Sequence, residues 1–212
     1  MSIQEQRMFT RHATLAICAL LTLVGAFAIP SKGVFAQAPR KSVSKGIVLR
    51  NIEKDPVRIS NIRVASTPHR FEEEFDANND WLRSLSFDVE NKSDRAIIYL
   101  EVALSFPETK SSGNEMAFTI YRGNRPGSSN PQKRETFYLA PGTKETFNVA
   151  ESYDWLTRFL QTRHSIRDMN RVEMEIGLAV FDNETAWRGG DFFVQDPNKA
   201  GRYIPAKKSP TP

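Results

Sequence analysis

Cysteine and histidine are scarce in this chain of 212 residues, which contains one cysteine and three histidines. Cys18 lies in an apolar stretch near the N-terminus, so the remainder of the chain has no thiol with which to form a disulfide. His69 and His164 are the histidines outside this region, and the sequence has no His-x-x-x-His or Cys-x-x-Cys spacing. A zinc site built on these ligands is therefore excluded.

Motifs for catalysis are missing as well. The chain has no Gly-x-Ser-x-Gly segment, the motif that presents the nucleophile in many hydrolases. A Ser-His-Asp triad would have to use His69, in an expected loop, or His164, at an expected helix end. The acidic run at residues 72–76 is typical of a solvated edge. We therefore predict a protein that is not an enzyme and uses no cofactor, with a hydrolase as the least favoured alternative.

The chain also lacks a strong excess of one charge. Its 29 lysines and arginines stand against 25 aspartates and glutamates, which gives a net charge of +4. Nucleic-acid binders concentrate their cations on one surface, and so small a surplus predicts no such surface. The apolar content of 40% and aromatic content of 10% exclude a disordered chain.

The N-terminal segment has the layout of a signal peptide. Arg7 and Arg11 precede an apolar stretch at residues 13–29, and Val34-Phe35-Ala36 offers small residues to a signal peptidase. We expect cleavage after Ala36, which makes residues 1–36 the signal peptide and leaves a secreted or periplasmic form with no membrane span. The alternative is that the stretch stays uncleaved as an N-terminal anchor, because its 17 residues are at the short limit for crossing a bilayer.

The rest of the chain divides into a flexible leader at 37–45, a β-domain at 46–196 and a flexible tail at 197–212. Apolar and polar residues alternate through the β-domain, which is the pattern of half-buried antiparallel strands. The alternation predicts strands at 46–49, 57–64, 81–91, 96–106, 116–121, 135–140, 144–149, 171–181 and 187–194. It slips at Ser60-Asn61, as it does at a β-bulge.

A single segment has helical periodicity. Trp155, Leu156, Phe159 and Leu160 recur at helical spacing, which predicts an amphipathic helix over 152–162 with Ser152 as its cap. We expect Trp155 and Trp187 to fill the core, since large aromatics at such positions generally do.

Two strands are expected to pair directly. Asn91-Lys92-Ser93-Asp94 is a turn sequence between 81–91 and 96–106, so these segments predict a hairpin. Seven to nine short strands with one crossover helix predict an all-β, immunoglobulin-like antiparallel β-sandwich. Asn91-Lys92-Ser93 and Asn183-Glu184-Thr185 match a glycosylation sequon, but both are expected to serve as turns.

Two stretches carry a family resemblance. The stretch Leu85-x-Phe-x-Val89-x-Asn91-x-Ser93 resembles exported immunoglobulin-like modules of bacteria. The segments Phe181-Asp182-x-x-x-x-Trp187-x-x-Gly190, Asp196-Pro197-Asn198 and Tyr203-Ile204-Pro205 resemble the end of a group of uncharacterised bacterial secreted proteins. The resemblance implies a sandwich fold and a location in the bacterial envelope, and it implies no catalytic residues.

A basic loop is the candidate binding site. Between residues 121 and 134 the chain carries Arg122, Arg125, Lys133 and Arg134 and no acidic residue. The ordinary interpretation of this loop is a flexible, soluble connector. Long loops at the ends of sandwiches often bind partners, so the sharper hypothesis is an anionic partner here, such as an acidic glycan or an envelope protein.

A metal site is not expected. Asp76-x-Asn78-x-Asp80 has the oxygen spacing that begins a calcium loop, but Trp81 replaces the required glycine and Phe87 the closing glutamate. The function we predict is an exported, non-enzymatic binding or structural module of the bacterial cell envelope. A carbohydrate-binding accessory domain is the alternative, and exposed coplanar aromatics would distinguish it.

Overall fold

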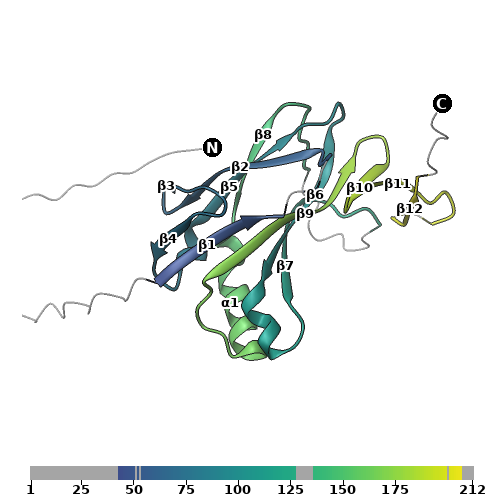
Figure 1. The fold of residues 1–212 in the computed structure, drawn as a ribbon. Helices are drawn as coiled ribbons and strands as arrows, with labels where there is room; N and C mark the ends of the chain where they lie inside the picture. The colour runs from purple at the N-terminus through teal and green to yellow at the C-terminus, as the bar shows by residue number, and fades with distance from the viewer. Residues whose placement is uncertain (1–42, 51, 53, 128–135, 200, 207–212) are drawn as a thin grey trace, which may run out of the picture. The chain divides into compact units, whose positions relative to one another are not determined.

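The computed structural model describes residues 43–50, 52, 54–127, 136–199 and 201–206. These residues belong to one compact unit, Pro39–Pro212, and they form an all-β sandwich of two sheets with α1, Ala150–His164 (Figure 1). The predicted signal peptide, with its cleavage site and its alternative as an anchor, lies outside the described residues.

The larger sheet is built around the long strand β9. It contains β1 (Val43–Leu49), β4 (Glu74–Ala77), β6 (Ile97–Phe106), β7 (Met116–Gly123), β9 (Arg171–Phe181), β10 (Thr185–Arg188), β11 (Asp191–Gln195) and β12 (Tyr203–Pro205). One edge of β9 pairs with β6, and the other edge pairs first with β1 and then with β10. The outermost strands on these sides are β7, β4 and β12.

The smaller sheet has the order β3-β2-β5-β8. Its strands are β3 (Thr67–Pro68), β2 (Val57–Val64), β5 (Leu85–Asn91) and β8 (Lys144–Asn148). The register of β2 against β5 shifts between Ser60 and Arg63, which confirms the predicted bulge. Two 3-10 helices, η1 (Trp81–Ser84) and η2 (Pro107–Ser112), precede β5 and β7.

The core lies between the sheets because each long strand alternates. Leu85, Phe87 and Val89 of β5 are buried, as are Val172, Met174 and Ile176 of β9. On the polar face of the smaller sheet, burial alone would raise the pKa of Asp88, but hydrogen bonds from Asn61, Thr146 and Arg63 outweigh it and hold that pKa below its ordinary value.

The predicted hairpin of 81–91 with 96–106 is wrong. β5 pairs with β2 and β8 in one sheet, whereas β6 pairs with β7 and β9 in the other. Residues 92–96 therefore carry the chain from one sheet to the other across the core. Alternation identifies which face of a strand is buried but says nothing about its neighbour, and two strands that face each other across a sandwich alternate just as two paired strands do.

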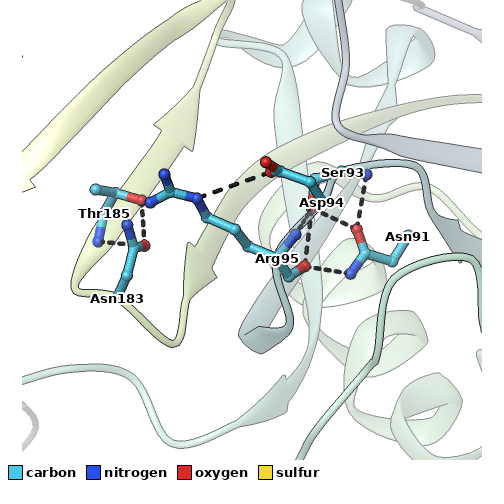
Figure 2. Close-up of polar contacts among 6 residues, drawn as sticks. All are labelled: Asn91, Ser93, Asp94, Arg95, Asn183 and Thr185. Atoms are coloured by element: carbon cyan, nitrogen blue, oxygen red, sulfur yellow. Dashed lines mark hydrogen bonds and ion pairs between the residues drawn. The ribbon is translucent and has the colours of Figure 1, made fainter.

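The side chain of Asn91 holds this crossing in place. Asn91 is fully buried, and its Nδ2 donates to the carbonyl oxygens of Arg95 at 2.7 Å and Leu139 at 2.9 Å. Its Oδ1 accepts from the backbone N–H and hydroxyl of Ser93 (Figure 2). Both predicted sequons are turns, since Asn183 likewise accepts from Thr185 in its own turn.

Three further segments differ from expectation. The chain forms η1 at Trp81 and Leu82, which are both buried. Neighbouring residues of a strand point to opposite faces, so a strand could not bury both against the same core. In the expected strand 135–140, the described residues 136–140 make a single bridge, between Leu139 and Ile97. The helix begins at Ala150, so Ser152 lies inside its first turn, and no side chain caps this end.

The domain boundaries also move outward. β1 starts at Val43, within the expected leader, and the side chain of Lys45 is fully buried, with its Nζ 2.5 Å from Asp168 Oδ1 and 2.9 Å from Asn170 Oδ1. β12 lies within the expected tail and pairs with β11. β1 runs parallel to β9, so the sandwich is not wholly antiparallel.

Candidate binding cleft

The two described cations of the predicted basic loop, Arg122 and Arg125, lie in different surroundings. The side chain of Arg122 is 16% exposed, with its guanidinium 3.7 Å from Glu151 and 5.2 Å from the centre of the Phe147 ring. The side chain of Arg125 is 66% exposed, and its Nε lies 3.8 Å from Glu101 Oε1. Lys133 and Arg134 lie outside the described residues. Of the two described cations, Arg125 is therefore the one presented to solvent.

Arg125 lies at the rim of a cleft of about 210 Å³ on the outer face of the larger sheet. Segments far apart in the sequence meet there: the loop after β7, the second half of β9, the hairpin of β10 with β11, and the turn before β12. The residues that line the cleft are Arg125, Pro126, Leu178, Ala186, Arg188, Phe193, Gly201 and Tyr203.

Strand alternation in β10 explains how the cleft obtains its floor and its second cation. Ala186 and Arg188 face the cleft, while Trp187 between them points into the core and is fully buried, as predicted. Ala186 is paired with Phe193 across the hairpin. The turn between β10 and β11 is Gly189-Gly190, and the φ angles of 57° and 94° favour glycine at both positions.

A second apolar cluster forms the floor. Tyr99, Val180 and Ala186 are buried outside the main core, and the half-buried Leu178 and Phe193 pack against them. This cluster places apolar side chains beneath two guanidinium groups. Such an arrangement suits a ligand that has both an apolar part and a negative charge.

A close backbone contact forms one wall. A Cβ atom at Gly201 would lie 2.3 Å from Gly127 Cα and 2.6 Å from the carbonyl oxygen of Pro126, so the turn before β12 and the loop after β7 touch through glycine. The turn is held by Asp196, whose Oδ1 accepts from the backbone N–H of Asn198 at 2.9 Å. Any larger residue at position 201 would push these two segments apart.

Acidic groups lie beside the cleft and not in its lining. Tyr99 donates to Glu101 Oε1 at 2.5 Å, and burial together with this carboxylate raises the pKa of Tyr99. Burial and then the charge of Glu184 raise the pKa of Tyr203. Both phenols are therefore neutral at physiological pH. Among the described residues, the lining of the cleft includes two arginines and no carboxylate.

The two histidines lie in separate surroundings. His164 Nδ1 is 2.7 Å from the hydroxyl of Ser112, and that hydroxyl also lies 2.9 Å from the carbonyl of Thr109, to which it donates. Since a hydroxyl has one hydrogen, Ser112 then accepts from His164 instead of being activated by it. The ring of His69 packs on Phe75, with ring centres 4.1 Å apart. Within the described ranges, neither histidine joins both a hydroxyl and a carboxylate.

The acidic segment is part of a sheet edge. Asp76 lies in β4 opposite Ser44 of β1, and the backbone of Asn78 and Asp80 begins η1. In the part of the chain that the structure describes, no three side chains from His, Cys, Asp and Glu are grouped so that they could hold a metal ion.

The expectation that Trp155 is a core residue is wrong. The buried face of α1 consists of Tyr153, Leu156 and Leu160, and Trp155 is 56% exposed beside it. Its ring lies between those of Phe118 and Phe159, with centres 5.5 Å and 5.3 Å away. Trp155 stacks on Phe159 at an interplanar angle of 18°, whereas Phe118 is tilted by 33°, so the three rings do not form one coplanar platform on which a sugar would lie.

Comparison with protein families, with curated proteins and with solved structures finds no match to this chain. Among the described residues, no helix has both the length and the apolar content needed to cross a membrane.

Sequence reasoning found one of the two cations at the cleft. Arg125 stands out in a basic loop, but Arg188 is a single arginine before a Gly-Gly turn. Because Trp187 is expected to point into the core, strand alternation places the next residue, Arg188, on the outer face of the sheet. What the sequence does not give is the register that brings this hairpin to the loop after β7.

Proposed function

We propose that this chain is an exported, non-enzymatic binding module of the bacterial cell envelope that recognises an anionic partner at the cleft. The observation that carries the proposal is a cleft lined by two arginines, Arg125 and Arg188, and by apolar side chains, with no carboxylate among the lining residues that the structure describes. Arginine donates in a planar fork that matches carboxylates and phosphates, and it keeps its charge at every physiological pH.

The immunoglobulin-like assignment and the envelope location belong to this proposal. They are supported by the sandwich of two sheets and by the signal-peptide layout of residues 1–36. The expected test result is a chain that begins at Gln37 when the protein is expressed in a Gram-negative host, recovered from the periplasm or the medium and examined by mass spectrometry. An intact chain in the cytosol would contradict export, and an intact chain in the membrane would favour the retained anchor.

Binding is tested directly with defined polymers. Immobilised protein should bind polygalacturonate or polyglutamate, and the double variant Arg125→Gln/Arg188→Gln should weaken this binding about tenfold or more, because charged hydrogen bonds contribute about 1.5–3 kcal/mol each. The matched control is Arg58→Gln/Arg163→Gln, which removes the same charge from exposed positions on β2 and α1. An equal loss in both double variants would show that only net charge matters, and would refute recognition at the cleft.

The carbohydrate-binding alternative draws support from one observation, the exposure of Trp155 on α1. The stacking of this ring on Phe159 weakens the alternative, since one face of the ring is engaged, and Phe118 is tilted against it instead of extending a flat platform. Retention on insoluble polysaccharide that disappears in Trp155→Ala would favour this alternative over the cleft.

A further inference from the structure

We propose that the group which enters the cleft is a carboxylate attached to a short apolar moiety, such as an acyl chain or the C-terminal residue of a peptide. This inference rests on the proposed function, because it names the chemistry that the cleft selects. It is argued from the size of the cleft, from its floor and from the arrangement of charge around it.

The size of the cleft limits the ligand. The cleft volume of about 210 Å³ is similar to that of an apolar cavity of about 150 Å³ that accepts benzene, so the cleft has room for one short aliphatic chain or one ring.

The floor selects an apolar group. Leu178, Ala186 and Phe193 line it, and Phe193 and Leu178 are only partly buried in the free protein. An apolar ligand would complete their burial, which water cannot do. An inorganic anion such as phosphate would pair with the arginines but would leave this surface uncovered, so it should bind more weakly than an apolar carboxylate.

The charges select the anion and its position. Arg125 is tethered through its Nε side, 3.8 Å from Glu101 Oε1, and Glu101 is itself fixed by the hydroxyl of Tyr99. At 3.8 Å this is a loose contact, and the Arg125 side chain remains 66% exposed. Arg188, which also lines the cleft, is exposed, and in the described ranges it makes no ion pair. A carboxylate in the cleft would be attracted by both arginines, whereas a cationic ligand would meet no acidic side chain among the described lining residues.

A neutral polar residue of the lining also fits the same ligand. Tyr203 lines the cleft, and its neutral phenol can donate a hydrogen bond to a carboxylate oxygen. The Gly201 contact with the loop after β7 keeps this tyrosine and Arg125 on connected segments. The cleft thus offers three donors around an apolar floor.

The test is a titration of the full chain followed by NMR or calorimetry. Hexanoate is the principal probe, acetate lacks its apolar part, 1-hexanol lacks its charge, and inorganic phosphate has charge alone. N-acetylleucine imitates a peptide C-terminus. We expect hexanoate to bind at least tenfold more tightly than acetate, 1-hexanol or phosphate. Arg188→Gln should lower the affinity for hexanoate at least tenfold, while Arg58→Gln should leave that affinity unchanged. Tight binding of N-acetylleucine as well would identify a peptide C-terminus as a source, and its failure beside hexanoate would identify a free acyl carboxylate.

Several outcomes overturn the inference. Equal binding of acetate or phosphate and hexanoate would remove the role of the floor, and equal binding of 1-hexanol would remove the role of the arginines. If no small probe binds but polyanions still bind through Arg125 and Arg188, this inference fails and the proposed function stands. If the polyanions also fail, both fall. Far-ultraviolet circular dichroism of each variant separates a lost site from a lost fold.

Discussion

Replacing Asn91 by aspartate isolates the contribution of one buried amide to the path of the chain between the sheets. The two side chains have nearly the same shape, so Asn91→Asp changes chemistry and not volume. In the native protein Nδ2 donates to the carbonyls of Arg95 and Leu139 at 2.7 and 2.9 Å. After the substitution an oxygen faces those two carbonyl oxygens, and a carboxylate is buried at a site with no exposed surface.

The cost follows from these contacts. Two hydrogen bonds of about 1 kcal/mol each are lost, and an unpaired charge in the interior adds about 3 kcal/mol or more. We expect Asn91→Asp to lower the free energy of unfolding by about 5 kcal/mol, a large share of the total for a domain of this kind. Asn91→Ala should cost less, about 2–3 kcal/mol, because the carbonyl of Leu139 keeps the N–H of Ile97 and the hydroxyl of Ser93, released from Asn91 Oδ1, can donate to the carbonyl of Arg95.

The chain contains its own control. Asn183 occupies a similar turn at the surface, where its Oδ1 accepts from Thr185 and its amide is not required as a buried donor (Figure 2). Asn183→Asp should therefore change the free energy of unfolding by less than about 0.5 kcal/mol. Urea denaturation followed by fluorescence of the buried tryptophans measures all three variants.

The pH dependence of Asn91→Asp has a defined sign. The buried site raises the folded-state pKa of the introduced carboxyl above its unfolded value, which is about 3.9. The part of the penalty that is due to the buried charge is then absent below the unfolded pKa, grows as the pH rises, and is complete above the folded pKa, whereas the loss of amide donors remains at low pH. Equal costs for Asn91→Asp and Asn183→Asp at neutral pH would refute the conclusion that this amide fixes the crossing.

Three other predictions concern side chains elsewhere in the sandwich. Asp168→Ala should lower the free energy of unfolding by about 3 kcal/mol, because it leaves the ammonium of Lys45 buried without its carboxylate. Lys45→Met should lower it by less than about 1 kcal/mol, since the carboxylate that remains is partly exposed. Urea titration compares the two variants. Because the folded-state pKa of Asp88 is lowered, its carboxylate stabilises the fold above the unfolded pKa, and this stabilisation is lost as the pH falls through the folded pKa. In Asp88→Asn the free energy of unfolding should therefore fall less steeply between about pH 5 and about pH 2 than in the native protein. Urea titrations at each pH measure the difference. Trp155→Ala should cost about 1 kcal/mol, against about 3–5 kcal/mol for the buried Trp187→Ala, and similar shifts in thermal melting would contradict the exposed position of Trp155.

Alternation along the chain was sufficient to predict the two-sheet class and the buried faces. It was not sufficient to predict pairing, as β5 and β6 show. Both have an apolar face toward the same core, and a short turn links them, so the sequence is equally compatible with a hairpin and with a crossing between sheets. The buried amide of Asn91, which satisfies backbone groups from two other segments, is what distinguishes these arrangements.

The helix shows a different limit. Trp155 and Leu156 are adjacent, about 100° apart around the helix, and both are apolar. Periodicity places them on one broad face, but the surface that α1 covers is narrower than that face. Leu156 is fully buried and Trp155 is left at the edge, where it packs on aromatic neighbours. The width of the receiving surface is a property of the packed sheets, and a single segment does not encode it.

Only part of the cleft can be predicted from the sequence. Alternation predicts the faces on which its residues lie, but it does not predict the strand register that brings these residues together. β10 is joined to β9 by only two residue pairs, Ala186 with Val180 and Trp187 with Ala179. On the core side of the same hairpin, Phe192 is 52% exposed, so the smaller sheet does not cover it fully. On this side Trp187 is the fully buried residue of β10, and Arg188 lies on the other face of the strand together with the buried Ala186. Because one strand carries both groups on opposite faces, the core packing of Trp187 fixes the position of the cation that the cleft requires.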